Sequence, residues 1–188
     1  MEKRHRVFIA INFPADIKRE LFTYSEKWPE LQAKWTVRDN LHITLQFLGD
    51  LTDQEVGEVC TAVKEVSEKQ KCFSLNINKI VYGPIEKSPP KFVWAMGEKS
   101  KELSALREDL EKTLTGRVTF IPENRTLAPH ITLARINAWA WKGIEPEERP
   151  EISENIDLLF TVESIEVMES VLKKGGPQYT ILESHELK

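Results

Sequence analysis

The tetrapeptide His-Ile-Thr-Leu occurs twice in the 188-residue sequence, at residues 42–45 and 130–133. The chain has only 4 histidines, so two of them lie in these copies. Two such matches would arise by chance on the order of a few times in 10⁴ sequences of this composition. In an extended strand alternate residues share a face, so each histidine lies beside its threonine. The repeat therefore predicts an internal duplication that presents two His/Thr pairs to one cleft.

The residue types in the two copies suit chemistry at a phosphodiester. His42 and His130 would form a general acid/base pair, because an imidazole with an ordinary pKa exists in both protonation states near neutral pH. The hydroxyls of Thr44 and Thr132 could hold the non-bridging phosphate oxygens. Arg135 would supply a charge complement to the phosphate. Strict alternation puts Arg135 on the opposite face, so the prediction requires a bend after Leu133.

Other uses of the polar residues are less well supported by the sequence. Two histidines and a carboxylate could hold zinc, but the His-x-x-x-His and Cys-x-x-Cys spacings are absent, so we expect no metal site. The two cysteines, Cys60 and Cys72, fit a reducing compartment. His5 and His185 are expected to be structural or surface residues. The net charge of −4 excludes a protein that coats nucleic acid by bulk electrostatics, but it allows a locally basic cleft.

Hydrophobic periodicity predicts about three helices and seven to eight strands, which favours an α+β fold with helices on mainly antiparallel sheet. The length fits one domain, residues 1–188, built as two lobes that each carry one His-Ile-Thr-Leu copy. No targeting or membrane-spanning segment is apparent, and we expect a cytoplasmic monomer. The expected helices are 14–28, 52–69 and 100–114; the expected strands are 7–11, 34–37, 41–48, 73–79, 92–96, 130–136, 159–172 and 178–186, with loops at 83–90 and 138–155.

With both motifs in view, the sequence resembles the two-histidine (2H) phosphoesterases, which are defined by paired His-x-Thr/Ser motifs. It resembles in particular the RNA 2′,3′-cyclic phosphodiesterase branch, also called 2′-5′ RNA ligase. The resemblance covers nearly the whole chain. It is carried by Arg6–Ile11, Trp35–Gly49, Phe92–Trp94, Pro129–Arg135 and Gly176–Thr180.

The resemblance implies a bilobal α+β fold with two antiparallel sheets, related by a pseudo-two-fold axis, flanked by helices and separated by an active-site cleft. It implies a hydrolase for RNA end processing that needs no metal or cofactor. His42 and His130 would be catalytic, and Thr44, Thr132 and Arg135 would bind the substrate.

The implied substrate is RNA with a 2′,3′-cyclic phosphate end, or a cyclic nucleotide, and the product is a 2′-phosphate. By analogy His42 would protonate the leaving 3′ oxygen and His130 would take a proton from water. The reverse reaction would join ends through a 2′-5′ linkage. Gln46 departs from the family pattern, since many relatives carry a basic residue there, on the His/Thr face.

Two alternatives remain open from the residues. One is a non-catalytic module that binds RNA ends or nucleotides. The other keeps the chemistry but acts on a small cyclic phosphate or a 2′-5′ linked oligonucleotide. Phe8, Trp35 and Tyr179 could stack on a base, but strand aromatics are expected to belong to the core. Trp139 and Trp141 could line the cleft mouth or simply pack.

Overall fold

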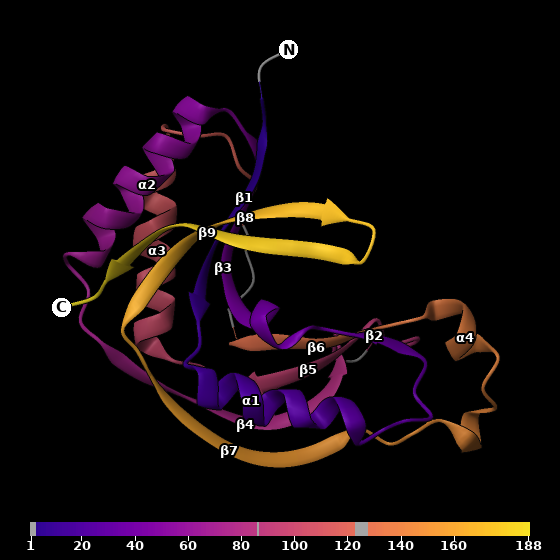
Figure 1. Cartoon of the computed structure of the whole chain (residues 1–188). Coiled ribbons are helices and arrows are strands. Elements are labelled where there is room, and N and C mark those ends of the chain that lie inside the picture. Colours follow the sequence, from indigo (N-terminus) through magenta and orange to yellow (C-terminus); the bar gives the residue numbers. More distant parts are fainter. Residues whose placement is uncertain (1–2, 86, 123–127) are drawn as a thin grey trace.

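The computed structural model describes residues 3–85, 87–122 and 128–188, and within them the chain is an α+β protein (Figure 1). All the pairings between described strands are antiparallel. The predicted fold class is confirmed. The strands are β1 (His5–Asn12), β2 (Ala33–Trp35), β3 (His42–Leu51), β4 (Phe73–Gly83), β5 (Phe92–Gly97), β6 (His130–Ile136), β7 (Ser153–Val162), β8 (Ser164–Lys173) and β9 (Gly176–Glu186); the helices are α1 (Ala15–Thr23), α2 (Asp53–Ser67), α3 (Lys101–Leu114) and α4 (Ala138–Lys142).

The strands follow the order β7-β4-β5-β6-β3-β1-β8-β9, and β2 pairs separately with β6. The two strands that carry the repeated motifs, β3 and β6, are neighbours at the centre of this order. Their register contains one residue pair, Ile43 opposite Ile131. This pair joins two halves of one sheet, with four strands of this order on each side and β2 added beside β6, whereas two separate sheets were expected. The halves nevertheless correspond in order, with a motif strand at the inner edge of each.

Helices cover the two halves separately. α2 packs on β1, β3, β8 and β9, and α3 packs beside α2 (Figure 1). α1 lies over the other half, where the ring of Phe13, just before the helix, contacts the ring of Phe160 on β7 at 4.8 Å. A capping box begins α2, because the Thr52 hydroxyl accepts from the Glu55 backbone N–H and the Glu55 carboxylate accepts from the Thr52 backbone N–H. Each half of the sheet is thus covered by its own helices, and the motif strands lie between the halves at the centre of the strand order.

Three predicted elements differ from the structure. The first helix ends at Thr23 and continues as a 3₁₀ turn, Tyr24–Glu26. The single strand expected at 159–172 is two strands, since β7 ends at Val162 and β8 begins at Ser164 and pairs far across the sheet. The expected loop after the second motif contains α4, because the Asn137 side chain accepts from two backbone N–H groups at the first turn.

In the described part of the chain, no helix is long and apolar enough to cross a membrane.

Candidate active site

The two motifs face each other across the Ile43–Ile131 pair. In an antiparallel register the residues on either side of this pair bring His42 beside Thr132 and Thr44 beside His130. Ile43 and Ile131 are fully buried on the core side, so the two histidines and two threonines share the opposite face. Side chains at such neighbouring positions lie about 5 Å apart at their Cβ atoms. The structure therefore brings together the four predicted residues of the repeat.

Each motif strand contains a register irregularity immediately after its threonine. On β3, Thr44 pairs with Ala10 but Gln46 pairs with Ile9, so Leu45 has no opposite residue on β1. On β6, Thr132 pairs with Trp94 but Ala134 pairs with Val93, so Leu133 is likewise extra. An extra residue on one strand reverses the alternation of faces beyond it. The burial sequence along both strands is the same as a result, with two consecutive buried residues after the threonine.

The bulge at Leu133 places Arg135 on the His/Thr face, as the predicted bend after Leu133 would. The guanidinium lies over the ring of Phe92 at 4.9 Å. Its charge also acts on the Tyr179 hydroxyl. Burial raises the pKa of this hydroxyl, and the charges of Arg135 and Arg6 partly oppose the rise. Arg135 is therefore directed toward the side of the sheet that carries the histidines.

The bulge at Leu45 corrects the expectation for Gln46. This side chain was expected on the His/Thr face, but it is 5% exposed and its Nε2 donates to the carbonyls of Phe47 and Ile121. Phe47 occupies the site face instead, and 64% of its surface is exposed. By position Phe47 corresponds to Arg135, five residues after its own histidine. The two halves thus present different chemistry at equivalent places.

His42 is held in one orientation by its two ring nitrogens. Nδ1 donates to the Asn40 carbonyl at 2.7 Å, and Nε2 lies 3.0 Å from the Thr44 hydroxyl. The proton on Nδ1 leaves Nε2 as the acceptor of the neutral ring. Burial, with smaller contributions from Lys18 and His130, lowers the pKa of His42 to about 4. His42 is therefore neutral at pH 7, with its basic nitrogen on the site face.

Lys18 on α1 supports the turn that precedes His42. It is 8% exposed, and its Nζ donates to the Asp39 carbonyl at 2.8 Å. The next carbonyl, that of Asn40, accepts from His42, so α1 fixes the short turn that orients the His42 ring. Burial lowers the pKa of Lys18, while the charges of Asp39 and Glu166 oppose this. Sequence spacing gave no sign of this role.

His130 has a matching environment in the other half. Its Nδ1 lies 3.3 Å from the Ala128 carbonyl, two residues back along the chain, as Nδ1 of His42 does with Asn40. Its ring packs against Trp94 with 4.4 Å between the ring centres. The Trp94 ring in turn lies directly over Gly83, where a Cβ atom would come within 2.2 Å of the indole. Gly83 is therefore required for the ring that supports His130.

Two aromatic residues that were expected in the core line the His42 side of the site. The rings of Phe8 and Tyr179 contact His42 at 5.0 and 5.1 Å, and Phe8 also contacts Phe47. Phe8 is buried, as expected, but on the site face of β1, apart from the main core. Trp35 instead stacks on Trp28.

The two tryptophans after the second motif have separate environments. Trp141 is buried and packs against Tyr82, so it is a core residue. Trp139 is 87% exposed. The remaining histidines are structural, as expected: His5 bridges Asp53 and Glu169 at 2.8 and 2.6 Å, and His185 pairs with Glu183.

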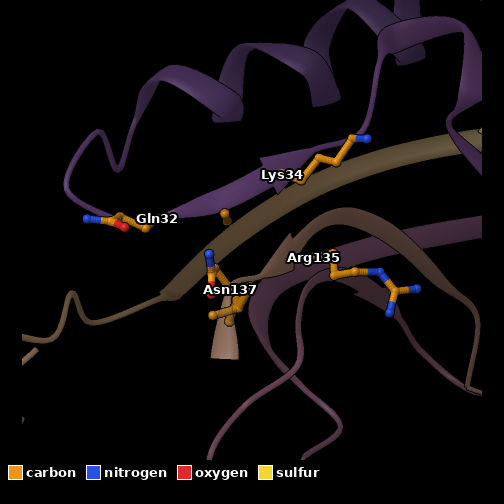
Figure 2. A pocket seen from close by; sticks show the side chains of 6 residues that line it. Gln32, Lys34, Arg135 and Asn137 are labelled. Atoms are coloured by element: carbon orange, nitrogen blue, oxygen red, sulfur yellow. The ribbon is translucent and has the colours of Figure 1, made fainter. Parts of the chain in front are cut away.

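A pocket of about 620 Å³ adjoins the site next to Arg135. It is lined by β2 and β6, which place Lys34 directly opposite Arg135. Figure 2 shows the charged ends of Lys34 and Arg135 extending to the same side of this pocket. Across the described ranges, no group of three or more His, Cys, Asp or Glu side chains is arranged to hold a metal ion.

Comparisons with known proteins agree with this geometry. A family described as LigT-like phosphoesterases matches residues 11–94, which include the first motif. An RNA 2′,3′-cyclic phosphodiesterase of Aquifex aeolicus is 28% identical, with 82% of this chain and 81% of the relative aligned. An RNA 2′,3′-cyclic phosphodiesterase of Thermotoga maritima is 27% identical, with 94% of this chain and 92% of the relative aligned. The solved structure of TT0787 of Thermus thermophilus superposes with a TM-score of 0.82 at 26% identity, covering 97% of each chain. The chain is thus similar to LigT-like phosphoesterases over nearly its whole length, in agreement with the 2H family that its paired motifs resemble.

Proposed function

We propose that this protein hydrolyses the 2′,3′-cyclic phosphate ends of RNA to 2′-phosphates by a two-histidine acid/base mechanism without a metal. The observation that carries the proposal is the Ile43–Ile131 register, which sets two His/Thr pairs on one face. The names of the relatives support the substrate, since those of Aquifex aeolicus and Thermotoga maritima are RNA 2′,3′-cyclic phosphodiesterases. The single domain is proposed to work as two lobes, each supplying one pair.

The cyclic phosphate would lie between the Nε2 atoms of the two histidines. Water attacks phosphorus, one imidazole takes a proton from that water, and the other gives a proton to the 3′ oxygen as the P–O3′ bond breaks. The 2′ bond is retained, so the product is a 2′-phosphate. Thr44 and Thr132 would donate to the non-bridging oxygens, and Arg135 would balance their charge. The Thr44 hydroxyl lies against His42 without substrate, so binding would turn it toward phosphate.

Ligation, which is the reverse of cleavage of a 2′-5′ linkage, would use the same groups. A 5′-hydroxyl in place of water would attack the cyclic phosphate and form a 2′-5′ linkage, with the same two proton transfers. Ligation therefore needs no residue beyond those of hydrolysis. The balance between the two reactions depends on whether water or a second RNA end reaches the phosphorus.

We assign His42 as the acid and His130 as the base, and this makes a prediction about the His42 pKa. With a pKa of about 4 the free protein carries no proton on Nε2 at pH 7. A bound phosphate anion stabilises the imidazolium, so a 2′-nucleotide should raise the His42 pKa by about 1–3 units. NMR titration of the ring signals with and without a 2′-nucleotide measures this shift, and a His42→Ala variant identifies the signal.

The same titration distinguishes the two role assignments. If the His42 pKa stays near 4 with the nucleotide bound, His42 is neutral in the complex and must be the base. His130 would then be the acid. In either case the kcat/KM profile should have one limb near pH 4, which reports His42 in the free protein.

The proposed function is tested with a 2′,3′-cyclic mononucleotide in the presence of a chelator. Hydrolysis that gives only the 2′-phosphate is expected, since the acid protonates the 3′ oxygen. Formation of a 3′-phosphate would contradict the proposed geometry, and absence of turnover would favour a binding module. Omitting the chelator is the control, and the rate should not change.

A further inference from the structure

The duplicated strands differ in chemistry at one equivalent position. Phe47 and Arg135 each follow the histidine by five residues and each reach the site face through a bulge. The ring of Phe47 contacts the ring of Phe8, whereas Arg135 lines the pocket beside Lys34. One flank of the site is therefore aromatic and the other cationic. A substrate with a base at one end and a chain of phosphates at the other would be oriented by this asymmetry.

The cationic flank is formed by a direct cross-strand pair. Lys34 on β2 is the register partner of Arg135 on β6, so the two side chains rise from the same face. Like charges at opposite positions destabilise a strand pair, unless an anion is bound between them. The chain as a whole carries a net charge of −4, so this pair is a local concentration of positive charge. Both cations line the pocket of about 620 Å³ (Figure 2).

The turn of the β8–β9 hairpin fixes the position of the Lys34 ammonium. Its Nζ donates to the Gly175 carbonyl at 2.9 Å. Gly176 has a φ of +125°, and a Cβ atom there would lie 2.7 Å from Nζ, so only glycine allows this close approach. An ammonium has three N–H donors, and this contact uses one. The lysine is thus held at the edge of the pocket with donors still able to bind an anion.

The distance along β6 from Thr132 to Arg135 suits the separation of two successive phosphates in RNA. Arg135 follows Thr132 by three residues, one of which is taken up by the bulge, so about two strand steps, or ~6.6 Å, separate them. We propose that the pocket binds the phosphodiester that precedes the terminal nucleotide of an RNA substrate, with Lys34 as its ligand and Arg135 shared between this phosphate and the terminal cyclic phosphate. This deepens the proposed function and depends on it. The protein would then prefer an oligonucleotide end to a free cyclic nucleotide.

The test compares two substrates, a 2′,3′-cyclic mononucleotide and a dinucleotide with the same terminal base and a 2′,3′-cyclic end. The measured quantity is the ratio of their kcat/KM values. Lys34→Gln should lower the dinucleotide/mononucleotide ratio about tenfold, the loss expected for one charge-assisted phosphate contact. Lys34→Arg should keep most of the ratio. A plot of log kcat/KM for the dinucleotide against log salt concentration should be less steep, by a slope of about 0.7, in Lys34→Gln than in the wild type.

Lys64→Gln is the matched control, since Lys64 is an exposed lysine on α2 and should leave the ratio at the wild-type value. If Lys34 only positions the hairpin, its loss would slow both substrates equally and leave the ratio unchanged, which would overturn the proposal. An unchanged ratio in a protein that hydrolyses the mononucleotide would contradict the subsite alone. Failure to hydrolyse either substrate would instead contradict the proposed function.

Discussion

Replacement of either His42 or His130 by alanine is expected to lower kcat for a 2′,3′-cyclic nucleotide by about 10²–10⁴-fold. In the proposed mechanism each histidine would supply one of the two proton transfers. A backbone carbonyl lies near each Nδ1, which leaves each Nε2 for the reaction. KM should change less, because in the proposed complex the threonines and Arg135 would still hold the phosphate. Steady-state kinetics with product analysis measures both constants.

The double variant His42→Ala/His130→Ala should be little slower than either single variant, since groups that act as a unit give non-additive losses. His185→Ala is the control. It removes a histidine that pairs with Glu183 rather than one from the motifs, and kcat should remain at the wild-type value. Wild-type kcat in either motif variant, with its melting temperature unchanged, would contradict the paired mechanism.

Much of the site could be predicted from the sequence because the motif is local and occurs twice. Alternation within each His-Ile-Thr-Leu copy is enough to put its histidine and threonine on one face. The buried isoleucines of the two copies then pair with each other, which brings the copies together. The α+β class followed in the same way from periodicity within short segments.

Beyond the threonines the prediction by alternation fails, and the reason is the bulge in each strand. Strict alternation placed Gln46 on the site face, whereas the extra Leu45 moves it into the core and brings out Phe47. A bulge depends on the partner strand as well as on the bulged one, so the residues of β3 alone do not reveal it. For Arg135 the family resemblance compensated, because it indicated a role that required a bend.

The residues that surround the histidines depend on contacts far apart in the chain. Tyr179 reaches His42 through the pairing of β9 with β8 and of β8 with β1. Lys18 reaches the turn before His42 from a helix in the other half of the molecule. Such contacts follow from topology, which residue spacing within a single strand or helix does not specify. The motif identifies the two histidines and two threonines, and the fold determines their orientation and lowers the pKa of His42.

Gly83→Ala is expected to destabilise the protein and to slow catalysis together. A Cβ at residue 83 would lie 2.2–2.7 Å from three atoms of the Trp94 indole, so the ring must move. Overpacking of this kind costs about 1–3 kcal/mol of unfolding free energy. Because Trp94 packs on His130 at 4.4 Å, the shift should also displace the imidazole and lower kcat. Urea unfolding and steady-state kinetics measure the two effects.

Gly57→Ala is the matched control for the stability measurement. Gly57 lies within α2 and a Cβ there meets no atom within 4 Å, so alanine should stabilise the helix by about 0.5–1 kcal/mol and leave kcat unchanged. A smaller ring should relieve the clash, so Trp94→Phe should cost less in the Gly83→Ala background than in the wild type. Additive losses, or a Gly83→Ala variant with full kcat, would show that Trp94 does not position His130.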